Sequence, residues 1–217
     1  MLSLILKKSR DSILEILCLG AHSDDIEIGC GGTILRLIQE YPMLKLNWII
    51  FSAKGVRAAE AQRSAELFLK QVKQKQVIVK EFREGYFPYI GSEIKDYFEQ
   101  LKHESTPDLI FTHYGQDCHQ DHKLVSELTW NTFRDHTIFE YEIPKYDGGL
   151  GSPNLFVHLD KALCDMKIEN ILECFKTQEN RHWFSAETFY STLRIRGIES
   201  RSPSYYAEGF YSRKIVM

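Results

Sequence analysis

Apolar and polar residues alternate along the chain in two rhythms, one typical of buried strands and the other of helices with one apolar face. Residues 13–20 form an apolar run broken by a single glutamate, as expected of a strand that is buried on both faces of a sheet. Residues 58–72 place apolar side chains three and four positions apart, which is the spacing of one helix face. Similar patterns predict strands at 46–52, 76–81, 109–113, 137–142 and 156–159, helices at 33–41, 94–103, 121–134, 161–175 and 186–196, and a strand-like run at 205–215.

Strands and helices therefore alternate through the first two thirds of the chain. This order is typical of βαβ units, so the predicted fold is α/β: a Rossmann-like, mainly parallel, doubly wound sheet with helices on both faces. Residues 144–153 are rich in turn-favouring residues, but no segment is long enough to act as a linker. We therefore expect residues 1–217 to form a single domain.

Composition and charge exclude several classes of protein. With 43% hydrophobic and 26% charged residues the chain has the composition of a globular protein, and its net charge of -3 argues against a general nucleic-acid binder. No apolar run approaches the ~20 residues that cross a bilayer. The basic residues 7–10 follow an apolar patch, the reverse of a secretory signal, so we expect a cytoplasmic protein without a transmembrane segment. The five cysteines, odd in number and without C-x-x-C spacing, argue against a disulfide framework and a structural zinc knuckle.

A first polar cluster follows the apolar run 13–20. His22, Asp24, Asp25 and Glu27 place one imidazole and three carboxylates at the exit of a predicted buried strand. Charged side chains are costly to bury unless they are paired or bind a cation, and open α/β sheets bind ligands at the carboxyl ends of their strands. The cluster therefore predicts a metal site, with the glycines at 29, 31 and 32 forming a turn that leads into the next helix.

A second cluster, at residues 119–122, supplies the ligand that the first one lacks. Three protein ligands and a water make a catalytic zinc site, so we expect His22, Asp25 and His122 to hold one ion. Because His119 and His122 are three residues apart at a predicted helix start, one can bind metal while the other points into the same cavity.

The remaining polar residues of the two clusters fit the roles that hydrolysis requires. A metal ion lowers the pKa of its water towards about 7, and Asp24 can accept the proton. His119 can serve as the proton donor to a departing amine, with Asp121 orienting it. We expect Asp117 and the histidines outside the clusters to be surface or supporting residues, not ligands: His103, His113, His136, His158 and His182.

Both clusters carry a family resemblance. Residues 21–33, AHSDDIEIGCGGT, resemble the A-H-P-D-D-x-E signature of the PIG-L/LmbE-type de-N-acetylases, and residues 119–122, HQDH, resemble that family's H-x-D-H motif. The resemblance implies a Rossmann-like, LmbE-like fold with one divalent ion, Zn²⁺ and in some members Fe²⁺, that hydrolyses the acetamide of an N-acetylglucosamine-type sugar. One departure is Ser23, which stands where the family usually has a proline. The roles implied by position are metal ligands for His22, Asp25 and His122, general base for Asp24, oxyanion stabiliser or amine protonation for His119, and partner of His119 for Asp121.

Two further elements of the resemblance concern the substrate. Residues 55–60 resemble a G-x-R-x-x-E element whose arginine, here Arg57, faces the sugar or its phosphate. Residues 82–85 resemble an F-x-D-G element whose acid binds sugar hydroxyls, and Glu84 takes the place of that Asp. The alternative for Arg57 is an ordinary salt bridge to Glu60 at a helix start.

The sequence therefore predicts a zinc-dependent N-deacetylase acting on a small N-acetylated sugar, such as a nucleotide sugar, a glycolipid or a polysaccharide precursor. Three alternatives stay open: an amidase for a non-sugar or thiol-conjugate amide, a non-haem iron oxygenase with the same ligand types, and a non-catalytic sugar-binding module. The sequence leaves the oligomeric state open, a homo-oligomer included.

Overall fold

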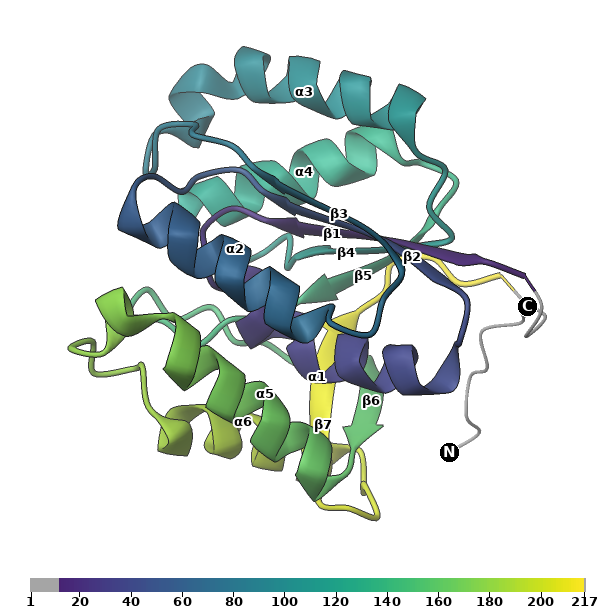
Figure 1. Ribbon diagram of the computed structural model, residues 1–217, viewed down its shortest axis with the longest axis vertical. Helices are drawn as coiled ribbons and strands as arrows, with labels where there is room; N and C mark the ends of the chain where they lie inside the picture. Colours follow the sequence, from purple (N-terminus) through teal and green to yellow (C-terminus); the bar gives the residue numbers. More distant parts are fainter. Residues whose placement is uncertain (1–11, 217) are drawn as a thin grey trace.

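The computed structural model describes residues 12–216, so the basic segment at residues 7–10 lies outside the described part of the chain. A seven-stranded sheet forms the centre of the molecule (Figure 1). Five of its strands run parallel, and the last two pair antiparallel at one edge, which confirms the predicted mainly parallel α/β fold. The spatial order is β3 (Gln74–Val79), β2 (Leu44–Ile50), β1 (Leu14–Gly20), β4 (Leu109–His113), β5 (Thr137–Tyr141), β7 (Tyr206–Tyr211) and β6 (Leu155–Leu159).

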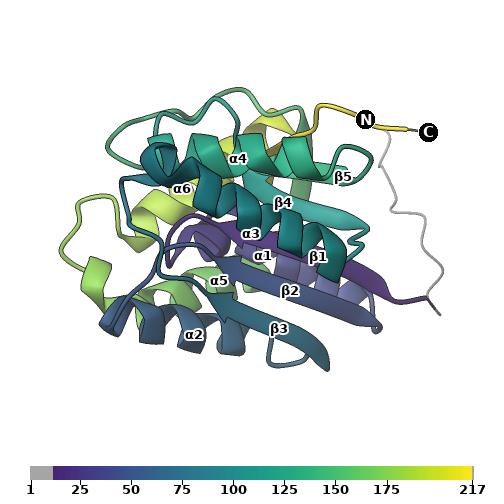
Figure 2. The same ribbon diagram turned by 90° about the horizontal axis from the view of Figure 1, so that it is seen from above.

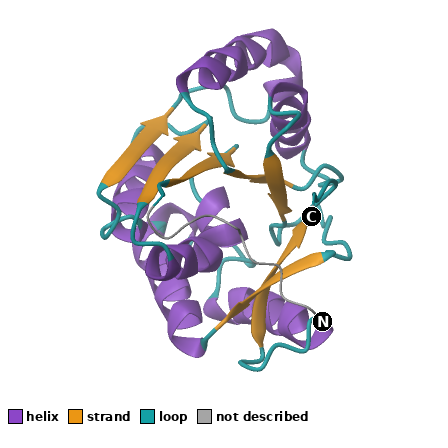
Figure 3. Ribbon diagram, turned by 90° about the vertical axis from the view of Figure 1, so that its right-hand side faces the viewer, coloured by secondary structure: helices purple, strands orange, loops and turns teal. Residues whose placement is uncertain are grey.

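Helices cover both faces of the sheet, as the alternation of strands and helices predicted. In Figure 1 the helices α3 and α4 lie above the sheet and the other four lie below it. The same two layers flank the strands in the side view of Figure 3. Each layer has its own apolar core, because the buried strands present side chains to both faces. The helices are α1 (Asp25–Glu40), α2 (Val56–Phe68), α3 (Gly91–Glu104), α4 (Gln120–Thr132), α5 (Lys161–Cys174) and α6 (Ala186–Glu199), with short 3-10 turns η1 (Phe87–Ile90) and η2 (Lys176–Gln178).

The strand order reverses between β1 and β4, which lie side by side at the middle of the parallel part of the sheet (Figure 2). The chain turns to one side of the sheet after β1 and to the other after β4. Such a switch point opens a crevice at the carboxyl ends of the two strands, where α/β proteins bind their ligands. The two polar clusters follow β1 and β4, so the topology brings them to the same crevice.

The start of α1 corrects one prediction. We expected a turn at the glycines and a helix from residue 33, but α1 begins at Asp25 and the glycines lie inside it. Packing explains the difference: a Cβ atom on Gly29 would lie 2.1 Å from the ring of Tyr141, so glycine is needed for the helix to approach β5. The glycines therefore serve close packing of a buried helix and not a turn.

Among the described residues, no helix has both the length and the apolarity that crossing a bilayer requires.

Candidate metal centre and active site

The fold brings the two clusters together. His22 and Asp24 occupy the short connection between β1 and α1, and Asp25 is the first residue of that helix. His119 precedes the first residue of α4, and His122 lies in the first turn. The ring centroids of His22 and His122 are 5.1 Å apart although the residues are separated by 100 positions. Residues that were predicted from two separate motifs thus form one buried site.

Three donor atoms of this site have the spacing of ligands around one ion. His22 Nδ1 lies 3.1 Å from His122 Nε2, and Asp25 Oδ2 lies 3.5 Å from each of them. In a tetrahedral zinc site with bonds of about 2.0–2.2 Å, neighbouring ligand atoms lie about 3.3–3.6 Å apart. The observed triangle therefore fits one divalent ion without rearrangement of the backbone.

The hydrogen bonds of the two imidazoles leave the correct nitrogens free to bind such an ion. His22 Nε2 contacts Asp121 Oδ2 at 3.1 Å, and His122 Nδ1 contacts Asp117 Oδ2 at 3.1 Å. If each of these nitrogens donates its hydrogen to the carboxylate, the lone pairs of His22 Nδ1 and His122 Nε2 face each other. Carboxylates orient metal-binding histidines in the same way in known sites. Two facing lone pairs need a proton or a cation between them, so the donor set fits a metal.

The pKa shifts of His22 and His122 agree with a cation between the two rings. Burial alone would lower the pKa of His22, but the carboxylates of Asp25 and Asp121 outweigh it and raise the pKa to about 10. Burial and the neighbouring His113 lower the pKa of His122 to about 3. The two rings therefore hold one positive charge between them, at the point that the donor atoms surround.

His113 was predicted to be a surface or supporting residue and is in fact fully buried at the end of β4. Together with Asp25 and His122 it forms a second group of donors that could hold an ion. However, His113 Nε2 accepts a hydrogen bond from the backbone amide of Ala21 at 2.9 Å, which occupies its lone pair. We therefore prefer His22 over His113 in the ligand set. In the sequence, His113 is the last residue of a mostly apolar predicted strand, and this position was the feature that could have indicated its burial.

Asp24 lies next to the ligand triangle and is nearly inaccessible, with 4% of its surface exposed. Burial and the negative charge of Asp25 raise its pKa to about 6, although Arg57 and His22 act in the opposite direction. The pKa of Asp25 moves the other way: burial would raise it, but the three surrounding histidines hold it well below the ordinary value. The two neighbouring carboxylates are thus clearly different, one suited to accept a proton and the other to remain ionised.

The carboxylate of Asp121 does not contact His119, the residue that we predicted as its partner. We expected its carboxylate to orient His119, but it accepts hydrogen bonds from the backbone amides of Gly85 and Phe87 and contacts His22. Only the backbone amide of Asp121 reaches His119, donating to Nδ1 at 3.2 Å. The side chain of Asp121 faces the start of η1, where the amides of Gly85, in the preceding loop, and of Phe87, the first residue of η1, satisfy the carboxylate. Asp121 thus orients a residue of the first cluster.

The two predicted substrate residues, Arg57 and Glu84, contact each other. Arg57 Nη1 lies 2.9 Å and 3.0 Å from the two carboxylate oxygens of Glu84, and Nη2 donates to Ser23 Oγ at 2.9 Å. The expected helix-start partner, Glu60, instead accepts hydrogen bonds from Thr177. Arg57 therefore does not form the simple helix-start salt bridge. The serine that replaces the family's proline supplies one of its acceptors.

Asp117 and Lys145 complete the surroundings of His122. Asp117 is 1% exposed, and Lys145 Nζ donates to its Oδ2 atom at 2.6 Å. Lys145 comes from the turn-rich loop after β5, where the sequence offered no sign of a link to the site. A Lys–Asp–His chain of contacts therefore supports the ligand from a third segment.

The fold and the buried histidine and carboxylate groups define an α/β protein with a candidate metal site at the switch point of its sheet. Residues 17–133 match the model of the PIG-L family, described as GlcNAc-PI de-N-acetylase. Since this match spans more than half of the 217 residues, the chain belongs to the PIG-L family.

Solved structures share the whole fold. The conserved protein TT1542 from Thermus thermophilus superimposes with a TM-score of 0.75 at 21% identity, over 94% of this chain and 96% of that one. The N,N'-diacetylchitobiose deacetylase from Pyrococcus horikoshii gives 0.68 at 19% identity, over 91% and 83%. GalB, the 4-carboxy-2-hydroxymuconate hydratase from Pseudomonas putida KT2440, gives 0.68 at 16% identity, over 94% and 98%. At these identities the likeness extends to the fold alone.

Proposed function

We propose that this protein is a divalent-metal-dependent deacetylase that hydrolyses the acetamide of an N-acetylglucosamine-type amino sugar to acetate and the free amine. Membership of the PIG-L family supports the deacetylase class. The observation that carries the proposal is the set of donor atoms from His22, Asp25 and His122, all within 3.5 Å of one another. Asp24 lies directly beside this set and has a pKa near 6.

His22, Asp25 and His122 would hold the ion. Two imidazole nitrogens and one carboxylate oxygen suit Zn²⁺ and also Fe²⁺, so we propose zinc first and iron as the alternative. When bound, the ion supplies a Lewis acid for the amide carbonyl and lowers the pKa of water.

Asp24 is the proposed general base. With a pKa of about 6 it is mostly ionised at pH 7, so it can accept a proton from the attacking water. The same moderate basicity lets it return that proton to the nitrogen of the departing amine. The amide C–N bond then breaks, and acetate and the amine are released.

His119 is the proposed oxyanion stabiliser. Burial and the nearby His22 lower its pKa, so the ring is neutral at pH 7. Because its Nδ1 accepts the backbone amide of Asp121, the hydrogen of the neutral ring resides on Nε2. The ring centroid of His119 lies 4.9 Å from that of His22, and its Nε2–H group can donate to the oxygen on which negative charge develops.

Arg57 and Glu84 are the proposed sugar-binding residues. Arg57 Nη2 lies 3.7 Å from Asp24 Oδ1, so its guanidinium is within one sugar ring's length of the proposed base. Arg57 is half-buried and Glu84 is exposed, and their donor and acceptor atoms suit hydroxyl groups next to the acetamide.

The fold alone does not select the reaction, because the hydratase GalB shares it. The parallel sheet does argue against the iron oxygenase, which usually has a β-barrel scaffold. A non-sugar amidase and a non-catalytic sugar-binding module are distinguished from the deacetylase by what the protein binds and releases.

The test is acetate release from a panel of N-acetylated sugars, sugar nucleotides and non-sugar amides, with metal analysis of the purified protein. We expect release only from N-acetyl sugars, loss of activity after chelation, and recovery with Zn²⁺ or Fe²⁺. Release from non-sugar amides alone would identify an amidase. Tight sugar binding without acetate release, by a protein that contains metal, would identify a binding module and contradict the proposal.

A further inference from the structure

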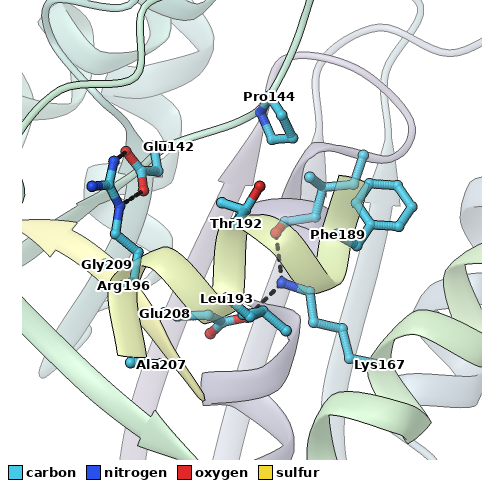
Figure 4. Close-up of a pocket in the computed structure, with 12 residues that line it drawn as sticks. Glu142, Pro144, Lys167, Phe189, Thr192, Leu193, Arg196, Ala207, Glu208 and Gly209 are labelled. Carbon is cyan, nitrogen blue, oxygen red and sulfur yellow. Dashed lines mark hydrogen bonds and ion pairs between the residues drawn. The ribbon is translucent and has the colours of Figure 1, made fainter. Parts of the chain in front are cut away.

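An ion pair between a lysine of α5 and a glutamate of β7 contacts the backbone of α1 in the middle of that helix. Lys167 of α5 donates to the carbonyl oxygen of Ile28 and to Glu208 Oε1, both at 2.7 Å. Glu208 of β7 accepts the backbone amides of Gly32 at 2.8 Å and Thr33 at 2.7 Å. Both charged side chains are only 3% exposed. Figure 4 shows Lys167 and Glu208 meeting between α5 and β7.

These contacts involve both ends of one helical hydrogen bond. In an α-helix the carbonyl of residue 28 normally accepts from the amide of residue 32. Here an ammonium group binds the carbonyl and a carboxylate binds the amide, so the ion pair competes for both partners. A carboxylate that accepts hydrogen bonds from two successive backbone amides is also typical of a helix N-terminus. The carboxylate of Glu208 therefore contacts the continuous helix α1 in its interior, about two turns after Asp25, in the way that an acidic group contacts a helix N-terminus.

Gly32 makes this approach sterically feasible. A Cβ atom at this position would lie 2.9 Å from Glu208 Oε1 and 2.4 Å from Leu159 Cδ1. Any side chain would therefore displace the carboxylate from the helix.

We propose that the Lys167–Glu208 pair is a positioning device for the metal site. It fixes the first segment of α1 and thereby the direction in which Asp25 presents its carboxylate to His22 and His122. The inference rests on the proposed metal-dependent function. Replacing a buried ion pair with neutral residues is often harmless to stability, which makes stability alone a weak reason for this pair. Its contacts with the backbone of the ligand-bearing helix give it a specific role.

The chain offers a matched control for this pair. Arg196 and Glu142 form a second buried ion pair, with Nε–Oε1 and Nη2–Oε2 distances of 2.5 Å and 2.8 Å and side chains 6% and 4% exposed. Both pairs line the same cavity of about 20 Å³ (Figure 4). Arg196 bonds the carbonyl of Gly151, and so anchors the loop after β5. Both ion pairs are buried and join one basic and one acidic side chain. They differ in their backbone contacts, since Lys167 and Glu208 contact α1 whereas Arg196 contacts the loop after β5.

The experiment compares the double variants Lys167→Met/Glu208→Gln and Glu142→Gln/Arg196→Met. The metal-free proteins are titrated with Zn²⁺ in a chelator competition, and amide hydrogen exchange of residues 25–31 is measured without metal. We expect the Kd for Zn²⁺ to rise about tenfold or more in the first variant, as for residues that orient ligands, and exchange in residues 25–31 to accelerate. The control pair anchors the loop that carries Lys145, so its variant should raise the Kd by no more than about two- to tenfold, the range expected for loss of Lys145, while exchange in residues 25–31 should stay unchanged even where its Tm falls. Equal changes in the two variants, or none in the first, would overturn the inference.

A pair of single substitutions tests the same inference if the first double variant does not fold. Gly32→Ala displaces Glu208 while keeping every charge. Gly31→Ala is its control, since a Cβ atom there would lie 2.8 Å from Phe68 Cε1 and 3.7 Å from Lys167 Cγ. We expect weaker Zn²⁺ binding for Gly32→Ala only. Equal Zn²⁺ affinity of both alanine variants contradicts the inference.

The wild-type protein separates this inference from the proposed function. A wild-type chain that binds no metal overturns both. If the wild-type chain binds Zn²⁺ and releases acetate while both ion pairs behave alike, only the positioning role is wrong.

Discussion

The two polar clusters follow equivalent strands of the sheet but lie in different environments. After β1 the chain enters α1 within the core, and Ser23, Asp24 and Asp25 are at most 4% exposed. After β4 the connecting loop is partly exposed, and His119 is only half-buried at the start of α4. The first cluster therefore supplies groups whose chemistry depends on burial.

The second cluster contributes orientation as well as a ligand. Its carboxylate Asp121 contacts His22 of the first cluster, and Asp117, just before the second cluster, contacts His122. Neither cluster is a complete site alone, since one provides the base and two ligands and the other provides the third ligand and the orienting groups. The comparison indicates that substitution of Asp24 should act on proton transfer, whereas substitution of a ligand in either cluster or of an orienting carboxylate should act on metal affinity.

The largest effect is expected from removing a ligand. His122→Ala should lower kcat/KM by about 10³-fold or more, because the donor set then lacks one imidazole. Metal content per chain and acetate release are the measurements. The matched control is His113→Gln, which keeps an acceptor for the amide of Ala21 and should retain the metal. Loss of metal in the His113→Gln variant would assign His113 to the ligand set. Retention of metal in the His122→Ala variant would remove His122 from that set.

Asp24→Asn should lower kcat/KM by about 10²–10⁴-fold, the usual contribution of a general base, while the metal content stays unchanged. Asp25→Asn, one residue further along, should reduce activity and metal content together. Steady-state kinetics with metal analysis distinguishes the two. An active Asp24 variant would remove the proposed base and leave the metal site intact.

The burial of Asp24 also predicts how stability depends on pH in the metal-free protein. Its pKa rises from 3.8 to about 6 on folding, so the folded state binds the proton more tightly than the unfolded chain. This favourable contribution is complete below pH 4 and is lost as the pH rises through 6. At pH 7 the ionised carboxylate then costs about 3 kcal/mol, since one pKa unit corresponds to about 1.4 kcal/mol.

Asp24→Asn should therefore stabilise the metal-free protein at pH 7 and have little effect at pH 4. Urea unfolding of both proteins at the two pH values measures this difference. The same stability difference at both pH values would contradict the assigned pKa.

The orienting carboxylates should have smaller effects. Asp121→Asn and Asp117→Asn should each weaken Zn²⁺ binding by about 10–100-fold, because the imidazoles of His22 and His122 lose the partners that set their tautomers. Chelator competition measures the affinity. If Asp121→Asn instead lowered kcat with unchanged metal affinity, its main partner would be His119, as we expected from the sequence.

The sequence predicted the strands and both clusters because these depend on local patterns. β4 has the same bounds as the predicted strand 109–113, and the other predicted strands and helices begin and end within a few residues of the observed ones, except at the start of α1. That start was wrong because glycines usually indicate turns, whereas here Gly29 permits contact with Tyr141. The role of Gly29 depends on a strand more than 100 residues away.

The supporting residues could not be predicted for the same reason. Asp121 was assigned to His119, its close neighbour in sequence, while its carboxylate contacts His22, 99 positions away. Asp117 was expected only as a surface or supporting residue without a stated partner, and Lys145 was not predicted; the fold shows that Asp117 contacts His122 and that Lys145 contacts Asp117. Motif spacing predicts which residues share a site, but not which oxygen contacts which nitrogen.

Lys145 gives the smallest expected effect and tests whether two clusters are enough to describe the site. It donates to the same Asp117 oxygen that contacts His122, and also to the carbonyl of Ile143. Lys145→Met should weaken Zn²⁺ binding about two- to tenfold, the range that one net hydrogen bond covers, because Asp117 keeps its contact with His122. Lys145→Arg should restore most of the affinity. If Lys145→Met were as damaging as Asp117→Asn, the loop after β5 would rank with the two clusters as a third essential part of the site.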